Sequence, residues 1–296
     1  MMYDLIEVTP KINKKKVIIV SIIAIIVIAI CIFIGIKAAK SHYSNIERNV
    51  SSNEIATDNI TNKNVTKTKH VAKISMNPTY TDVGKELMKN IYHTGEKIAY
   101  LTFDDGPSKS VTPLILDLLK QENIKATFFV LGARAELNPE IIKREYSEGH
   151  YIANHGYSHV YGDIYSSSQA VLDEYNKTKD TIRKILGTDY DGHLFRFPGG
   201  STGGKYKNIK KDAEQLLNDN NIAYIDWNAL SSDAAGAKTK EALIENTKES
   251  VGNKNSVVIL MHDAGDKILT YEALPEIISY LREQGYTFKN FYSVIK

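Results

Sequence analysis

The chain has 296 residues, of which 43% are hydrophobic, and its 37 Lys and Arg nearly balance its 35 Asp and Glu, giving a formal net charge of +2. This balance excludes a strongly basic nucleic-acid-binding protein, and the length allows a domain with a proper hydrophobic core. The only cysteine, Cys31, excludes an intramolecular disulfide.

The N-terminal segment predicts a membrane anchor. Residues 1–16 contain four lysines and precede residues 17–36, which contain no charged side chain. A helix of this length spans about 30 Å, enough for the hydrocarbon core of a bilayer. The basic flank predicts that residues 1–16 form a cytoplasmic tail and that everything after the helix is extracellular. A cleaved signal peptide is the alternative, but its apolar segment is usually shorter and ends in a small-x-small site. We therefore expect a retained, single-pass transmembrane helix at 17–36.

Residues 37–90 are rich in Ser, Thr, Asn and Lys and contain few large apolar residues. Such a segment cannot bury enough apolar surface to offset the loss of chain entropy on folding. We therefore predict a flexible extracellular linker over 37–90 and one folded domain over 91–296, which carries a slight excess of acidic residues.

From residue 97 onward, short β-rich segments alternate with longer amphipathic ones. The predicted strands cover residues 98–103, 126–131, 151–154, 194–197, 223–227, 257–261 and 286–288. The predicted helices cover residues 111–122, 139–148, 168–186, 209–220, 239–251 and 271–284. This alternation is typical of an α/β fold, and it predicts a distorted (β/α) barrel of about seven parallel strands.

Two carboxylates stand where the first predicted strand ends. Asp104 and Asp105 follow the apolar run 98–103 and precede a Gly-Pro turn. One carboxylate could bind a metal ion while the other accepts a proton, as metal-assisted hydrolysis requires. The alternative is structural, because Asp is also favoured at turns and as a cap for the helix expected from residue 111.

A histidine pair follows the third predicted strand. His155 and His159 are four residues apart, a spacing that lets both rings face one metal ion. Two histidines alone are more often structural, but two His with one Asp form a recurrent ligand set for divalent metals, including the iron of oxygenases. Further polar residues end the later strands, namely Arg196, Asp226 and His262. Because catalytic residues of parallel α/β folds gather at the carboxyl ends of the strands, the joint arrangement predicts one site.

These residues resemble the motifs of a known family, the polysaccharide deacetylases, also called the NodB-homology domain of carbohydrate esterase family four. The resemblance covers residues 91–296 and rests on five motifs in order along the chain. They are Thr-Phe-Asp-Asp-Gly-Pro at 102–107, His-Gly-Tyr-Ser-His at 155–159, Arg-Phe-Pro-Gly-Gly at 196–200, the segment 226–233, and Leu-Met-His at 260–262. The first two motifs are specific in combination, whereas the last two would mean little alone.

The resemblance implies a divalent metal held by Asp105, His155 and His159, with zinc favoured over cobalt or another divalent ion. Three protein ligands leave an open position on such a metal, where water can bind. The resemblance also implies that Asp104 is the general base and that a backbone N–H near Gly199 helps to bind the oxyanion.

The resemblance assigns further roles to residues near the C-terminal motifs. His262 would protonate the departing amine, for which a group with a pKa near neutrality is suited. Arg196 would orient the base and Asp233 would tune His262, where the structural alternatives are a surface ion pair and a turn cap. Leu260 would form the pocket for the acetyl methyl group, and Trp227 would form a groove wall or pack in the core.

Two positions depart from the family pattern. Gly199 stands where the third motif commonly has an aromatic residue, and Ala234 follows Asp233 where a tryptophan is common. Both changes are expected to open the wall of the substrate groove, while the metal ligands and the proton-transfer groups remain in place.

The sequence therefore predicts a membrane-anchored, metal-dependent hydrolase that removes N-acetyl groups from cell-envelope glycan. N-acetylglucosamine of peptidoglycan is the favoured substrate, because an outward-facing domain near the membrane meets wall polymer first. The alternatives are an O-acetyl esterase of the xylan type, a chitooligosaccharide deacetylase of the same fold, and a non-catalytic wall-binding module. We expect an acetylated glycan and the membrane as partners, with neither nucleic acid nor an obligate protein partner.

Overall fold

The structure, a computed structural model, describes residues 77–296. The predicted cytoplasmic tail, the transmembrane helix at 17–36 and the linker up to residue 76 lie outside the described residues. Within residues 77–296, no helix combines the length and the apolar character needed to cross a bilayer.

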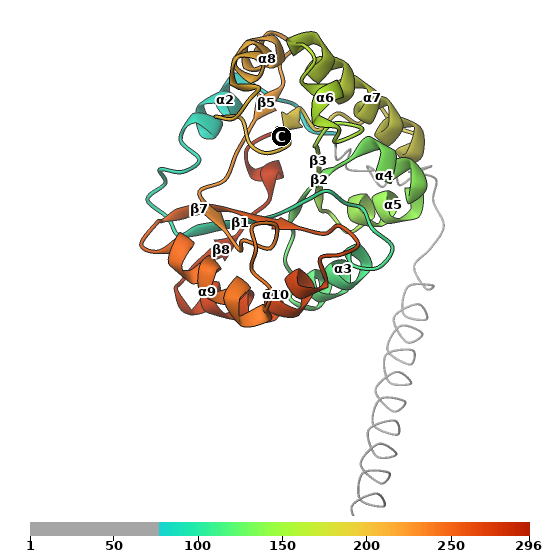
Figure 1. Ribbon diagram of the computed structural model, residues 1–296. Helices are drawn as coiled ribbons and strands as arrows, with labels where there is room; N and C mark the ends of the chain where they lie inside the picture. Colours follow the sequence, from blue (N-terminus) through green and yellow to red (C-terminus); the bar gives the residue numbers. More distant parts are fainter. Residues whose placement is uncertain (1–76) are drawn as a thin grey trace, which may run out of the picture. The chain divides into compact units, whose positions relative to one another are not determined.

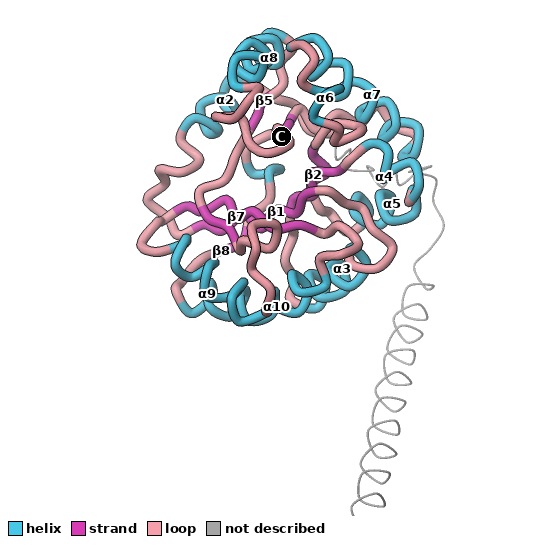
Figure 2. Tube along the Cα trace, in the orientation of Figure 1, coloured by secondary structure: helices cyan, strands magenta, loops and turns pink. Residues whose placement is uncertain are grey.

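A parallel sheet forms the centre of the described domain (Figures 1 and 2). Its strands are β1 (Ile98–Asp104), β2 (Thr127–Val130), β3 (Tyr151–Asn154), β4 (Leu194–Phe195), β5 (Ala223–Tyr224), β6 (Ala229–Leu230), β7 (Ser256–His262) and β8 (Thr287–Phe288). The hydrogen-bonded order is β5-β4-β3-β2-β1-β7-β6, and β8 pairs with the start of β1. All of these pairs are parallel. The predicted α/β class with about seven parallel strands is confirmed.

The sheet is curled into a half-barrel that does not close. Its two outer strands, β5 and β6, make no pair with each other in the part of the chain that the structure describes. Each contains only two residues, so β5 is shorter than the predicted strand 223–227. The sequence did not predict β6, because residues 229–230 show no alternation that separates them from the predicted strand 223–227.

Helices surround the sheet, and most of them cover its outer side (Figure 1). They are α2 (Asp82–Lys89), α3 (Thr112–Gln121), α4 (Gly132–Leu137), α5 (Pro139–Ser147), α6 (Tyr161–Ile164), α7 (Ser168–Leu186), α8 (Lys207–Asp219), α9 (Lys240–Val251) and α10 (Ile268–Glu283), followed by the 3-10 helix η1 (Phe291–Ser293). The six predicted helices correspond to α3, α5, α7, α8, α9 and α10. The short helices α4 and α6 lie in connections and were not predicted.

The described domain begins before residue 91, so the predicted linker is too long at its C-terminal end. The Thr81 side chain accepts a hydrogen bond from the Gly84 N–H and caps α2. The backbone of Thr79 pairs with that of Lys296. These contacts tie the segment before β1 to the folded domain. Composition could not reveal them, because the second joins residues at opposite ends of the domain sequence.

The alternation of side chains along β1 decides which of them reach the inside of the half-barrel. Leu101 and Phe103 belong to the outer apolar cluster, which packs under the helices. Tyr100 belongs to the inner cluster. Because successive side chains of a strand lie on opposite faces, Thr102 and Asp104 share the inner face with Tyr100. The last residue of β1 thereby brings a carboxylate to the interior at the carboxyl end of the sheet.

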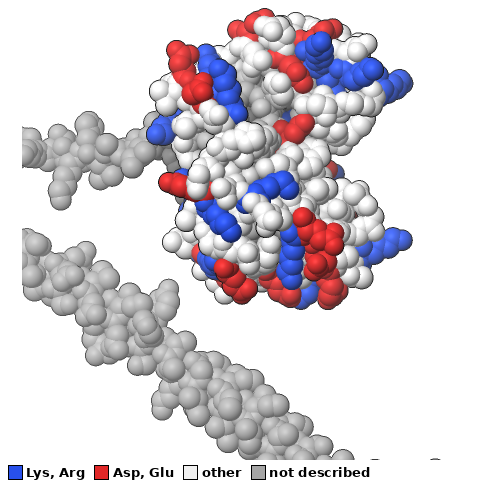
Figure 3. All heavy atoms as spheres, turned by 90° about the vertical axis from the view of Figure 1, so that its left-hand side faces the viewer, with Lys and Arg blue, Asp and Glu red and all other residues white. Residues whose placement is uncertain are grey.

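Charged side chains of both signs are interspersed over the face of the domain shown in Figure 3. This pattern agrees with the near balance of positive and negative residues in the sequence. The described residues on this face form no extended basic patch of the kind that binds nucleic acid.

Candidate active site

The polar residues predicted at the strand ends lie together at the carboxyl end of the sheet. Asp104 ends β1 and His262 ends β7, and the two are partners in the register of this parallel pair. His155 follows β3, and Arg196 follows the neighbouring strand β4. The parallel sheet therefore brings residues from distant parts of the sequence to one edge.

Asp105, His155 and His159 form a cluster of three potential metal ligands. One ligand atom of each residue lies within 4.8 Å of the other two. Asp105 Oδ1 is 3.6 Å from His155 Nε2 and 3.4 Å from His159 Nε2. Asp105 and His159 have positive φ angles of 70° and 60°. Non-glycine residues rarely adopt this conformation, and it often marks functional sites.

This cluster fits a divalent metal ion. Asp105 Oδ1 is buried and has no hydrogen-bond partner among residues 77–296, and a buried acceptor of this kind is costly unless a ligand satisfies it. His155 Nδ1 lies 2.8 Å from the Arg196 carbonyl, which leaves Nε2 facing Asp105. Burial lowers the pKa of His155 and so favours the neutral imidazole that binds metals. One carboxylate and two imidazoles are a donor set that zinc and related divalent ions accept.

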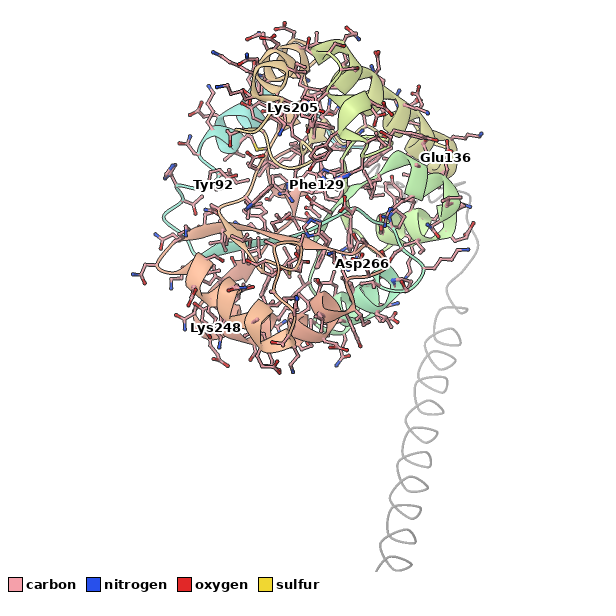
Figure 4. The ribbon with its side chains drawn as sticks, viewed as in Figure 1. Tyr92, Phe129, Glu136, Lys205, Lys248 and Asp266 are labelled. Carbon is pink, nitrogen blue, oxygen red and sulfur yellow. The ribbon has the colours of Figure 1, made fainter. Side chains whose placement is uncertain are left out.

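The Asp104 side chain is held by Arg196. Arg196 Nη1 donates to Asp104 Oδ1 and to Thr102 Oγ1, each over 2.8 Å. The guanidinium is fully buried, donates to two backbone carbonyls as well, and lies 3.9 Å from the centre of the Phe129 ring, labelled in Figure 4. The other oxygen of Asp104, Oδ2, lies 3.8 Å from His155 Nε2. The structure thus brings together the arginine and the aspartate that the resemblance paired.

His262 is held by Asp233, whereas Asp226 accepts hydrogen bonds from Ser201. His262 Nδ1 lies 2.8 Å from Asp233 Oδ1, and the His262 backbone N–H donates to Asp233 Oδ2 over 2.7 Å. Thr270 Oγ1 donates to the same Oδ2. Burial lowers the pKa of His262, but the hydrogen bond and the negative charge of Asp233 outweigh burial and raise this pKa to about 9. His262 is therefore protonated at neutral pH.

Three other predicted residues lie around these groups. Gly199 has a φ angle of 74°, and its N–H donates no hydrogen bond to any residue that the structure describes. Leu260 lies on β7 and is 9% exposed. The Trp227 ring is partly buried against the inner cluster, with its centre 5.8 Å from the Arg196 guanidinium. Of the two locations considered for Trp227, the structure thus places it beside the core.

The groove wall near Gly199 is not open, contrary to the expectation from the sequence. A Cβ atom added at Gly199 would lie 2.5 Å from the Tyr161 hydroxyl oxygen. Tyr161 is the first residue of α6, and its ring centre lies 5.4 Å from that of the candidate ligand His159. An aromatic side chain from the loop after β3 therefore occupies the space next to Gly199. The proximity of Tyr161 to His159 in sequence is the only signal that could have indicated it.

Two buried carboxyl groups near the site belong to none of the motifs. Asp263 follows His262, and its Oδ2 accepts a hydrogen bond from Thr112 Oγ1 over 2.5 Å. Burial raises the pKa of Asp263 to about 7. Glu145 of α5 is fully buried, and neither of its carboxyl oxygens has a hydrogen-bond partner within residues 77–296. Burial, and then the charge of Asp263, raise the pKa of Glu145 well above its ordinary value.

The fold and the site together define an α/β protein with a candidate divalent-metal centre beside a carboxylate and a protonated histidine. The family model for polysaccharide deacetylases matches residues 92–218. A Bacillus cereus protein named peptidoglycan-N-acetylglucosamine deacetylase is 32% identical over 235 residues, which cover 78% of this chain and 82% of that protein. The chain therefore belongs to the polysaccharide deacetylase family.

Two solved structures share both sequence and fold with this chain. A CE4 esterase from Streptococcus mutans is 31% identical and has a TM-score of 0.64, with 72% of this chain and 92% of the other covered. The catalytic domain of a peptidoglycan N-acetylglucosamine deacetylase from Eubacterium rectale is 35% identical and has a TM-score of 0.61, with 69% and 92% covered. The likeness therefore extends over nearly the whole of both solved domains.

Proposed function

We propose that this protein is a metal-dependent N-deacetylase of cell-envelope glycan that acts on N-acetylglucosamine residues of peptidoglycan. The observation that carries the proposal is the convergence of Asp105, His155 and His159 on one point, with Asp104 alongside and His262 at the end of the neighbouring strand. Membership of the family supports deacetylation. The names of the Bacillus cereus and Eubacterium rectale relatives support peptidoglycan as the substrate.

The three-residue cluster would hold the metal ion. Zinc is the favoured ion, because catalytic zinc sites commonly use three imidazole or carboxylate ligands and keep one position open. A bound divalent ion would polarise the substrate carbonyl and lower the pKa of water. Cobalt and other divalent ions accept the same donors, so the ligands alone do not fix the choice.

Asp104 would act as the general base and take a proton from the attacking water. Arg196 fixes one oxygen of this carboxylate by a 2.8 Å hydrogen bond, and the second oxygen remains directed toward the cluster. The N–H of Gly199 is not used by the described residues and would donate to the oxyanion that forms on the acetyl carbonyl. Leu260, at the same end of β7 as His262, would contact the acetyl methyl group.

His262 would act as the general acid. An amide nitrogen must gain a proton before the C–N bond breaks, since an amide anion is too basic to leave. The imidazolium favoured by Asp233 would donate that proton, so that the products are acetate and a free amine on the sugar. The two proton transfers thus use separate groups, each held by its own charged partner.

The location of the protein is part of the proposal. Residues 17–36 would span the cytoplasmic membrane once, with residues 1–16 inside and the catalytic domain outside on a linker that starts at residue 37. The uncharged stretch and the lysines before it support this orientation. An enzyme placed in this way would meet peptidoglycan directly.

Acetate release is the direct test. The purified full-length protein, supplied with zinc, would be incubated with N-acetylglucosamine oligosaccharides and with peptidoglycan, and free acetate and deacetylated products would be measured. We expect release by the wild type and a loss of at least about a hundredfold in Asp104→Asn, because the general base is removed. A zinc-loaded wild type that releases no acetate from any of these substrates would contradict the proposal.

Cleavage of O-acetyl esters is the second candidate, and the likeness to the Streptococcus mutans esterase favours it. An alkoxide leaves more readily than an amide nitrogen, so ester cleavage depends less on a general acid. His262→Ala should therefore abolish acetate release from N-acetyl sugars while sparing part of any activity on O-acetyl xylan. A wild type that cleaves only the ester would make the esterase the correct function.

A further inference from the structure

Tyr161 presents an aromatic ring and a free hydroxyl beside the candidate metal ligands. The residue is 40% exposed, although its ring centre lies 5.4 Å from that of His159 and 5.7 Å from that of Tyr165. The hydroxyl makes no hydrogen bond to the residues that the structure describes. Both the ring and the hydroxyl can therefore contact a molecule bound next to His159.

The hydroxyl lies against a loop position that has no side chain. A Cβ atom at Gly199 would come within 2.5 Å of the Tyr161 hydroxyl oxygen and 3.3 Å of its Cζ. Even a methyl group at position 199 would thus displace the tip of the ring. The loop after β3, which carries Tyr161, and the loop after β4, which carries Gly199, therefore meet in a contact that requires the tyrosine on one side and the glycine on the other.

Neighbouring contacts hold Tyr161 in this position. The Tyr165 N–H donates to the Tyr161 carbonyl over 3.1 Å within the turn of α6. The buried Tyr165 hydroxyl donates to the carbonyl of Pro198, the residue before Gly199, over 2.7 Å. Tyr165 thereby ties α6 to the loop that contains Gly199. A side chain placed in this way loses little freedom when a ligand binds, which favours recognition.

We propose that Tyr161 is a substrate-binding residue that sets the position of the acetylated sugar ring at the metal-ligand cluster. Its exposed ring offers an apolar face to a pyranose ring, and its hydroxyl offers a hydrogen bond to an oxygen of the sugar next to Gly199. The inference rests on the proposed deacetylase function and names an N-acetylated pyranose as the ligand. It places one wall of the sugar site on the loop after β3.

The test compares Tyr161→Ala and Tyr161→Phe with wild type in the full-length protein. Val160→Ala is the matched control, because Val160 is the preceding residue and is 50% exposed. The kcat and KM for deacetylation of an N-acetylglucosamine oligosaccharide would be measured, together with the zinc affinity of the metal-free protein by calorimetry. We expect KM to rise about tenfold in Tyr161→Ala and about threefold in Tyr161→Phe, with Val160→Ala and all zinc affinities within about twofold of wild type.

Two results would overturn the inference. One is a KM in Tyr161→Ala equal to that of wild type. The other is a loss of activity matched by an equal loss of zinc affinity, because Tyr161 would then only support His159. If Tyr161→Ala does not fold, Tyr161→Phe keeps the ring, and its KM decides whether the hydroxyl contacts the sugar.

The contact with Gly199 provides an independent test. Gly199→Ala should raise KM in the wild-type background, because the new methyl group displaces the Tyr161 ring. In the Tyr161→Ala background the substitution still strains the positive-φ backbone at position 199 but meets no ring, so its effect on KM should be smaller than in the wild-type background. Additive effects of the two substitutions on KM would contradict the inferred coupling.

A failure of the proposed function can be told apart from a failure of this inference. A wild type that releases no acetate contradicts the function. Oligosaccharide binding to Asp104→Asn protein, measured by calorimetry with and without Tyr161→Ala, still tests the sugar contact. An affinity lowered about tenfold by Tyr161→Ala supports the inference, and an unchanged affinity overturns it.

Discussion

His262 Nδ1 lies 2.8 Å from Asp233 Oδ1, and each residue shifts the pKa of the other toward its charged form. Burial opposes the charge on each residue. It raises the pKa of Asp233, but the hydrogen bonds from His262 and Thr270 outweigh it and lower this pKa overall, while Asp233 raises the pKa of His262 to about 9. The pair is therefore an aspartate and an imidazolium that depend on each other.

Asp233→Asn should shift the pH dependence of catalysis. A general acid must be protonated to act, so activity falls as the pH rises through the pKa of His262. The amide removes the negative charge that raises this pKa. The alkaline limb of the kcat profile should therefore shift to lower pH by about one unit or more. Profiles from pH 6 to 10 would show the shift. An alkaline limb at the same pH in wild type and variant would mean that it reports another group.

The same substitution should change stability in a pH-dependent way. The pKa of His262 is higher in the folded chain than the ordinary value of 6.5. The resulting stabilisation is fully present below about pH 6.5 and is lost as the pH rises through about 9. Asp233→Asn should therefore lower the free energy of unfolding most at pH 6, and the difference from wild type should shrink toward pH 10. Urea titrations at these pH values would measure it, and a constant difference would contradict this origin.

Arg196→Ala should strongly destabilise the fold. It would leave the Asp104 carboxylate buried without the partner that lies 2.8 Å away, a loss typically of about 3–5 kcal/mol in the free energy of unfolding. Adding Asp104→Asn in the same chain removes the unpaired charge and should recover part of the loss. Urea denaturation of both single variants and the double variant forms the cycle that measures this coupling. Strictly additive losses would show that the ion pair contributes little.

Zinc should stabilise the wild type through Asp105 rather than Asp104. A ligand present at a hundred times its Kd stabilises a folded protein by about 2.7 kcal/mol when it does not bind the unfolded chain. We therefore expect zinc to raise the Tm of wild type and of Asp104→Asn, and to leave the Tm of Asp105→Ala nearly unchanged. Differential scanning calorimetry with zinc and with chelator would test this. If zinc changed the Tm of both aspartate variants equally, Asp105 as metal ligand and Asp104 as general base could not be distinguished in the proposed way, and this assignment would be excluded.

The site residues that could be predicted from the sequence are those that stand at the ends of strands. Asp104, His155, Arg196 and His262 each follow an apolar segment, and parallel strands bring such positions to one edge. Alternation along β1 also decides that Asp104 faces inward. Each of these patterns involves residues that are close together in the sequence, so it can be recognised without the structure.

The contacts that the sequence did not reveal join segments with no shared pattern. Tyr161 and Gly199 belong to different loops, and their contact depends on how α6 packs against the turn after β4. The docking of Thr79 on Lys296 likewise requires the folded domain to exist first. Motif comparison reports which residues are present at a site, but the space around a glycine is a property of the packed structure.

Glu145 should destabilise the protein increasingly as the pH rises. Its carboxyl group is fully buried without a hydrogen-bond partner among the described residues, and burial raises its pKa well above the ordinary value of 4.5. The folded chain therefore retains a proton that the unfolded chain releases, so the free energy of unfolding falls as the pH rises above about 4.5. Glu145→Met removes both the titration and the unpartnered oxygens, and it should raise the free energy of unfolding at pH 8 by about 1–3 kcal/mol.

The control is Glu140→Gln, at an exposed position of the same helix, which should change the free energy of unfolding by less than about 0.5 kcal/mol. Urea titrations from pH 5 to 8 in chelator would give both values, and a Met variant less stable than wild type at pH 8 would show that the carboxyl group has a stabilising partner.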